Sequence, residues 1–198
     1  MTRTVNCRKY KKELPGLEHP PYPGQKGEDI FEYKSQGKVV VESMMEMFKR
    51  VEIPYAEFSG FFDHARRRGL IPLSTATDFE AVDALDEMGV GAFKVGSDDI
   101  VFTPFLKYIA KKGKPVIIST GMATLSELAE TVAESVTIGG DELALLKCTS
   151  TYPSTPEGTN SNTIPHMREM FNCEVGLSDH TMGVGVSVAS VALGATVI

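Results

Sequence analysis

Side chains capable of acid–base, metal or anion chemistry gather where apolar segments of the chain stop. Five consecutive segments end in this way. The residues at their ends are Ser74, Thr75, Thr77, Lys94, Ser97, Asp98, Asp99, Ser119, Thr120, Thr149, Ser150, Tyr152, Ser178, Asp179, His180 and Thr181. Cations, hydroxyls and backbone N–H groups in turns are the usual ligands of phosphates and carboxylates. The set therefore predicts an anion-binding site.

Lys94 is unusual because it lies inside the apolar stretch Ala-Phe-Lys-Val-Gly, residues 92–96. Burying an unpaired ammonium group is unfavourable in free energy, which points to a functional role. It could anchor a phosphate or carboxylate, or form a Schiff base as in some aldolases. Alternatively, its aliphatic stem could carry the charge to solvent at the strand end.

His180 is the only histidine that follows an apolar segment. It could be a helix-capping residue, a core residue with a satisfied hydrogen bond, or a metal ligand. The sequence has no HxxxH or HxH pattern and no Cys/His cluster, which are the spacings typical of complete metal sites. A metal bound at His180 would therefore need ligands from elsewhere.

The apolar segments alternate with amphipathic patterns, as expected for strands and helices in turn. We expect strands at 70–75, 92–96, 115–120, 143–148, 175–178 and 195–198, and helices at 55–68, 79–88, 125–135 and 164–171. Continuously apolar strands are typical of parallel sheets. Such an α/β pattern fits a TIM-type (β/α) barrel or an open doubly wound sheet. Polar residues at the ends of five strands favour the barrel, whose catalytic groups come from many strands.

The predicted barrel is incomplete. Six strands are expected where a barrel has eight, with the first two missing. Residues 1–38 contain Pro15, Pro20, Pro21 and Pro23 and are expected to form an irregular Pro/Gly-rich loop segment, while residues 39–198 form a partial (β/α) barrel catalytic domain.

Composition excludes several other classes of protein. A net charge of −6 without long runs of like charge argues against nucleic-acid binding. The apolar run near the end of the chain is too short to span a bilayer, so no membrane partner is expected. Three cysteines without a CxxC pair favour reduced thiols and a cytoplasmic protein.

Four ordered motifs resemble the sialic acid synthase family, which includes N-acetylneuraminate, legionaminic acid and pseudaminic acid synthases. They are KVGSDDI, GKPVIISTGMATLSE, LLKCTSTYP and GLSDHTMGVGVSVASVALGATVI. The resemblance implies a transferase that condenses phosphoenolpyruvate with an N-acetylated sugar, giving a nonulosonic acid and phosphate. It also implies a divalent metal, Mn²⁺ or Mg²⁺, and a homodimer.

The resemblance also assigns roles to individual residues. The positions implied to bind phosphoenolpyruvate or the sugar are Thr75, Lys94, Ser97, Ser119, Ser150, Tyr152 and Ser178. Lys94 becomes an electrostatic anchor, and Asp99 stands where many relatives have a glutamate proposed to act in acid–base steps. His180 matches one of two metal-binding histidines.

Several family features have no counterpart in the sequence. These are the second metal histidine, a first-strand glutamate, a second-strand lysine and the C-terminal antifreeze-like domain. We therefore expect the isolated 198-residue chain to show negligible synthase activity. The alternative is a truncated, non-catalytic remnant or a fragment that depends on a partner, because an incomplete barrel leaves two sheet edges open.

Overall fold

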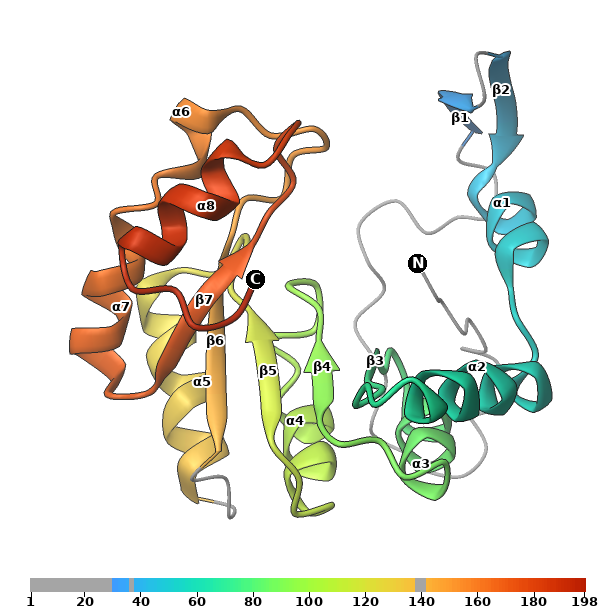
Figure 1. Ribbon diagram of the computed structural model, residues 1–198, viewed down its shortest axis with the longest axis horizontal. Coiled ribbons are helices and arrows are strands. Elements are labelled where there is room, and N and C mark those ends of the chain that lie inside the picture. Colours follow the sequence, from blue (N-terminus) through green and yellow to red (C-terminus); the bar gives the residue numbers. More distant parts are fainter. Residues whose placement is uncertain (1–29, 36–37, 138–141) are drawn as a thin grey trace.

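A parallel sheet of five strands is the centre of the computed structural model, which describes residues 30–35, 38–137 and 142–198. The strands lie side by side in sequence order (Figure 1). They are β3 (Ser74–Thr75), β4 (Phe93–Val95), β5 (Val116–Ser119), β6 (Leu143–Cys148) and β7 (Glu174–Ser178). Sequential parallel neighbours of this kind are built from repeated βα units, as the sequence predicts.

The described residues form eight helices, of which α3 to α7 connect the strands of this sheet. They are α1 (Met44–Val51), α2 (Tyr55–Arg67), α3 (Phe79–Glu87), α4 (Thr103–Ala110), α5 (Leu125–Thr137), α6 (Pro156–Thr159), α7 (Thr163–Phe171) and α8 (Gly185–Ala192). The sequence-based helices at 55–68, 79–88, 125–135 and 164–171 agree with α2, α3, α5 and α7. In the part of the chain that the structure describes, no helix is both long and apolar enough to cross a bilayer.

The hydrophobic core lies between one face of the sheet and the helices. The alternate strand residues Phe93 and Val95 are fully buried in it, together with Leu145. The helices α3, α4, α5 and α7 all contribute to this same cluster. A doubly wound sheet has helices on both faces. Four helices sharing one core with the same strand face instead match the outer ring of a barrel-type fold.

The first and last predicted strands differ from the structure. The predicted strand at 70–75 is reduced to Ser74–Thr75, because Pro72 has no N–H to donate to a ladder. Residues 195–198 form no assigned strand. They nevertheless make two backbone hydrogen bonds to β7, from Leu177 N to Val197 O (2.8 Å) and from Thr196 N to Val175 O (3.0 Å). The described sheet therefore has five strands instead of six.

A β-hairpin crosses the predicted boundary between the loop segment and the barrel domain at residues 38 and 39. Strand β1 (Ile30–Ser35) pairs antiparallel with β2 (Lys38–Ser43), so the segment 30–35 is regular and not loop. Most of the predicted loop segment, residues 1–29, lies outside the described residues. The hairpin and α1 lie away from the five-stranded sheet in Figure 1.

Helix ends follow the expected capping chemistry. Thr124 and Glu127 form a reciprocal capping pair before α5, with Thr124 N to Glu127 Oε2 at 2.7 Å and Glu127 N to Thr124 Oγ1 at 3.3 Å. The helix α3 begins with a single cap, since Asp78 accepts from Ala81 N at 2.7 Å. Gly69 follows α2 with a φ of +75°, as expected of a residue that ends a helix.

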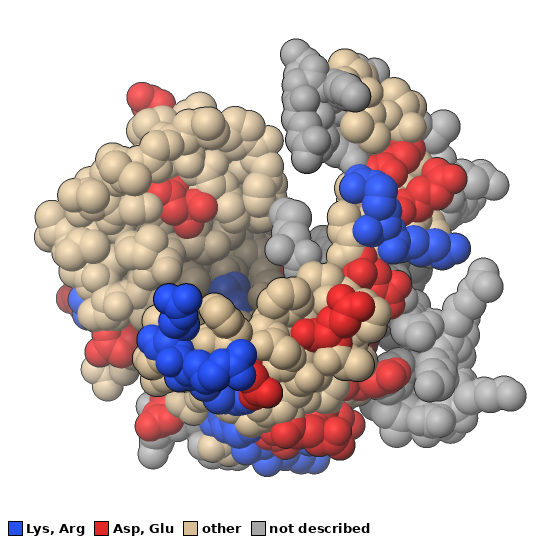
Figure 2. Space-filling view, turned by 45° about the vertical axis from the view of Figure 1, so that its right-hand side comes forward, with Lys and Arg blue, Asp and Glu red and all other residues tan. Residues whose placement is uncertain are grey.

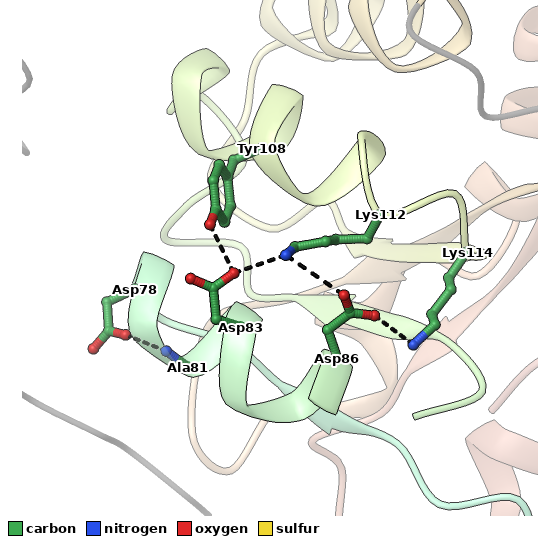
Figure 3. Close-up of polar contacts among 7 residues, drawn as sticks. All are labelled: Asp78, Ala81, Asp83, Asp86, Tyr108, Lys112 and Lys114. Carbon is green, nitrogen blue, oxygen red and sulfur yellow. Dashed lines mark hydrogen bonds and ion pairs between the residues drawn. The ribbon is translucent and has the colours of Figure 1, made fainter. Parts of the chain in front are cut away.

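An ion-pair network fastens α3 to the segment before β5, at the amino end of the sheet (Figure 3). Asp83 accepts from Lys112 and from the Tyr108 hydroxyl, each at 2.7 Å. Asp86 pairs with Lys114 at 2.6 Å and with Lys112 at 3.5 Å. Each charged group therefore has a partner of opposite sign, and the network links α3, α4 and β5.

Candidate anion site at the carboxyl end of the sheet

The register of the strands brings the predicted site residues to one face. Thr75 pairs with Lys94, and Cys148 pairs with Ser178. Partners in register point to the same side of a sheet, and successive residues alternate. Thr75, Lys94, Ser119, Cys148 and Ser178 therefore share the face opposite the helix-covered core.

Lys94 is held among neutral oxygens at this face. Its Nζ donates to Ser119 Oγ at 2.6 Å and to the Val95 carbonyl at 2.9 Å. Burial lowers the pKa of Lys94, and the negative charge of Asp98 partly opposes the shift. Lys94 is half-buried and both of its hydrogen-bond acceptors are neutral, so its charge is incompletely compensated and the site favours an anionic ligand.

Hydroxyls from neighbouring loops gather around Gly121, which follows β5. The Gly121 N–H donates to Ser97 Oγ at 3.0 Å. Ser150 Oγ and Cys148 Sγ also border the space next to the Gly121 Cα. The loops after β4, β5 and β6 thus bring two hydroxyls and a thiol together, close to the Lys94–Ser119 pair.

The hydrogen-bond donors of this cluster indicate what it can bind. An ammonium group has three donors, of which Lys94 uses two in the described contacts. Ser119 Oγ and Ser97 Oγ both act as acceptors there, so their own protons remain available. Such an arrangement presents donors from three groups, which suits a phosphate or carboxylate. A hollow with a Lys or Arg side chain at its bottom is visible in Figure 2.

His180 lies beyond the end of β7 and packs against Tyr152. Its Nδ1 lies 2.7 Å from the Thr149 carbonyl oxygen, and its ring centroid is 4.0 Å from that of Tyr152. A carbonyl can only accept, so Nδ1 carries a proton, and in the neutral ring Nε2 is the nitrogen with the lone pair. Tyr152 is 67% exposed. Its ring therefore covers one side of His180 and meets solvent on the other.

The turn that carries His180 is fixed by Asp179. Its carboxylate accepts from Thr181 N at 2.8 Å and from Ser187 Oγ, in the first turn of α8, at 2.5 Å. Partial burial tends to raise the pKa of Asp179, but the hydrogen bonds from Ser187 and Thr181 outweigh it and lower the pKa overall. The charged form is therefore favoured, and it ties the turn to α8.

Asp99 does not lie open to the proposed site. Its side chain is 1% exposed, and its main chain closes the turn after β4 through Asp99 N to Gly96 O at 3.2 Å. Burial raises the pKa of Asp78, to which the nearby charge of Asp99 adds. Asp99 is thus a neighbour of the α3 N-terminus.

The described residues offer a divalent metal one ligand, the imidazole of His180. The Nε2 lone pair of His180 suits Mn²⁺ or a similar ion. Within residues 30–35, 38–137 and 142–198, no group of three or more His, Cys, Asp or Glu side chains could hold a metal. His180 can therefore supply one ligand, and the described residues do not complete the set.

Cys148 is a part of the cluster to which sequence reasoning gave no role at the site. The alternation of β6 places it on the same face as Leu146, and its register partner is Ser178. Gly121 is a second such residue. Its close neighbours come from β6 and from two other loops, which one sequence does not reveal.

Two family models match parts of the chain. Residues 25–198 match the NeuB family, which is most of the chain. Residues 1–39 match a second family, described as Bacterial Fe(2+) trafficking. Only residues 30–35, 38 and 39 of that second match lie in the described part of the structure.

Similar proteins include synthases of acidic sugars. The N,N'-diacetyllegionaminic acid synthase of Campylobacter jejuni is 38% identical over 159 residues, covering 79% of this chain and 48% of the relative. The N-acetylneuraminate-9-phosphate synthase of Mus musculus is 34% identical over 151 residues, covering 76% and 42%. The chain spans about half the length of the curated relatives it matches.

A solved structure supports the fold. The N-acetylneuraminic acid synthetase of Leptospira borgpetersenii, in complex with citrate, superimposes with a TM-score of 0.73 at 28% identity. The match covers 76% of this chain and 52% of that protein. The chain thus has an α/β fold with a parallel sheet, like that of TIM-barrel-type synthases.

Proposed function

Because the chain belongs to the NeuB family, we propose that it forms the phosphoenolpyruvate-binding part of a nonulosonic acid synthase. In the proposed reaction, phosphoenolpyruvate condenses with an N-acetylated sugar, and water and phosphate complete the balance. The names of similar proteins support a sugar acid as product. We further propose a cytoplasmic homodimer.

The observation that carries the proposal is the donor array around Lys94. Phosphoenolpyruvate has a phosphate and a carboxylate, which both need cations and N–H or O–H donors. Lys94 has one donor left after its bonds to Ser119 and Val95. The hydroxyls of Ser97 and Ser119 accept at their oxygens, which leaves their protons for a ligand.

The described residues would act by holding and orienting the anion. In the proposed step, C3 of phosphoenolpyruvate forms a bond to the aldehyde carbon of the open-chain sugar. Water adds at C2, the C2–O bond breaks, and inorganic phosphate leaves. Lys94 and the serine hydroxyls would bind the phosphate before and after this bond breaks, which stabilises the charge it carries. Thr75 and Ser178, on the same face, would contact the rest of the molecule.

The end of the site near His180 would receive the sugar. Tyr152 is exposed next to His180 and would contact the acceptor. A divalent ion, Mn²⁺ or Mg²⁺, bound with His180 as one ligand would polarise the aldehyde oxygen as a Lewis acid. The acid–base role of Asp99 stays a prediction, and its burial means that the turn after β4 would have to move before a substrate could reach it.

The burial of Asp99 also favours a second function for the chain. A chain that binds the anion but lacks a reachable acid–base group would be a non-catalytic or partner-dependent fragment. It would retain phosphoenolpyruvate affinity without turnover. Phosphate release in the presence of phosphoenolpyruvate, an N-acetylated hexosamine and Mn²⁺ distinguishes this function from synthesis.

Calorimetric titration of the 198-residue chain with phosphoenolpyruvate tests the proposed function. We expect one molecule to bind per chain, and pyruvate to bind at least about tenfold more weakly because it lacks the phosphate and its charge-assisted hydrogen bonds. Failure to bind phosphoenolpyruvate, or equal affinity for pyruvate, would overturn the proposal.

A further inference from the structure

Gly121 has a position that its backbone conformation does not explain. Its φ is outside the left-handed region in which glycine is favoured, so another residue could adopt the same backbone. It is nevertheless buried, directly after the end of β5. The reason for a glycine must therefore lie in what surrounds its Cα.

The space that a side chain would fill is already occupied by three groups from other segments. A Cβ at Gly121 would overlap Ser150 Oγ, and would lie 2.9 Å from Ser97 Oγ and 3.2 Å from Cys148 Sγ. Cβ contacts under 3.0 Å essentially never occur, so something would have to shift. The absence of a side chain is thus what allows the hydroxyls of two loops to meet next to β5.

The backbone N–H of Gly121 adds a directional effect. It donates to Ser97 Oγ at 3.0 Å, which occupies one lone pair of that oxygen. The Ser97 proton must then point away from Gly121. Ser97 is thereby left as a donor toward groups other than Gly121, and Ser150 Oγ borders the same space beside the Gly121 Cα.

We propose that Gly121 is a positioning residue for anion binding. The absence of a side chain leaves room for the hydroxyls of Ser97 and Ser150, and the Gly121 N–H orients Ser97. Both hydroxyls can then donate to the same phosphate or carboxylate group. This inference rests on the proposed function, because it takes phosphoenolpyruvate as the anion. Gly121 itself makes no contact with the ligand through a side chain.

The variant Gly121→Ala tests the inference, with Gly60→Ala as its matched control. Gly60 lies within α2, and nothing lies within 4 Å of the Cβ it would gain. We expect Gly121→Ala to bind phosphoenolpyruvate about tenfold more weakly, as for loss of one charge-assisted hydrogen bond. Gly60→Ala should bind within about twofold of the unsubstituted chain. Equal affinity of Gly121→Ala and the unsubstituted chain would overturn the inference.

A double-mutant cycle with Ser150→Ala separates positioning from a general structural effect. Removing Ser150 Oγ removes the closest atom that the new methyl group would meet. We therefore expect Gly121→Ala to cost much less affinity in the Ser150→Ala background than alone, a non-additivity typical of contacting residues. Losses that simply add would contradict the inference.

The design remains decisive if Gly121→Ala alone does not fold. The double variant then removes the closest overlap and leaves the approach of 2.9 Å to Ser97 Oγ, which a small rotation of that side chain relieves. Its affinity for phosphoenolpyruvate should match that of Ser150→Ala within about twofold. A tenfold difference between these two would refute the inference. If the unsubstituted chain binds no phosphoenolpyruvate, the proposed function and the inference fail together. If it binds and the cycle is additive, only the inference fails.

Discussion

The two ends of the sheet differ in how their charged side chains are paired. At the amino end, Asp83 and Asp86 pair with Lys112 and Lys114 within 2.6 to 3.5 Å (Figure 3). At the carboxyl end, the described contacts of Lys94 are with a hydroxyl and a carbonyl. The same fold therefore holds paired charges at one end and an ammonium among neutral groups at the other.

The directions of the pKa shifts show what this difference means. The hydrogen bond that Lys112 donates to Asp83 raises the pKa of Lys112, so pairing stabilises its charge. Burial lowers the pKa of Lys94, so the protein opposes its charge. A paired network fixes structure, whereas an incompletely compensated cation gains most from an external anion. These directions support the proposal that the ligand binds at the carboxyl end of the sheet.

The largest expected effect on phosphoenolpyruvate affinity comes from removing the charge of Lys94. Lys94→Met should weaken phosphoenolpyruvate binding about a hundredfold, because it removes the charged donor. Its free energy of unfolding should stay the same or rise at neutral pH. The lowered pKa means that folding penalises the charged form until the pH exceeds 10.5. Calorimetric titration and urea unfolding measure the two quantities.

Lys112→Met is the matched control at the amino end. It should leave phosphoenolpyruvate affinity within about twofold. It should also lower the free energy of unfolding by about 1 kcal/mol or less, since partly exposed ion pairs contribute little. If Lys112→Met weakened binding as much as Lys94→Met does, the division between the two ends would be wrong.

A smaller effect should appear in the acid stability of the amino end. The hydrogen bond from Lys114 lowers the pKa of Asp86, against a smaller effect of burial. A lowered carboxyl pKa contributes stability above its unfolded value of 3.8 that is lost as the pH falls through the folded pKa. Asp86→Asn should therefore be less stable by about 1 kcal/mol or less at neutral pH.

Urea unfolding at a series of pH values checks this. The gap between Asp86→Asn and the unsubstituted chain should close as the pH falls below 3.8. A gap that stays constant with pH would mean that the carboxylate charge does not stabilise this end of the sheet.

Much of the sheet and its helix layer was predictable from periodicity. The predicted strand at 143–148 is identical to β6, because a continuous apolar run between turn residues leaves little freedom. Sequence also singled out Lys94, since a lysine in an apolar strand is rare. The shared face of Thr75, Lys94 and Ser178 then follows from the register, which alternation alone does not fix between strands.

Other features depend on packing that one sequence does not encode visibly. The turn after β4 buries Asp99 to 1% exposure, whereas the polar residues Ser97 and Asp98 beside it in the sequence favour a solvent-exposed turn. The space beside Gly121 is filled by groups from β4 and β6 loops, which lie far away in the chain. The hairpin of β1 and β2 was also missed, because its prolines and glycines upstream suggested loop.

The most direct test of the central claim is proton uptake when phosphoenolpyruvate binds. Across a pH series from about 8 to about 10 a phosphate monoester is fully ionised, since its second pKa is about 6. Any proton taken up or released on binding then belongs to the protein and not to the ligand. An anion beside Lys94 should raise its lowered pKa and draw a proton from solution. Titration calorimetry in two buffers of different ionisation enthalpy measures this uptake. We predict uptake by the unsubstituted chain and by Lys112→Met, and none by Lys94→Met. Binding without proton uptake, or equal uptake by Lys94→Met, would contradict the account.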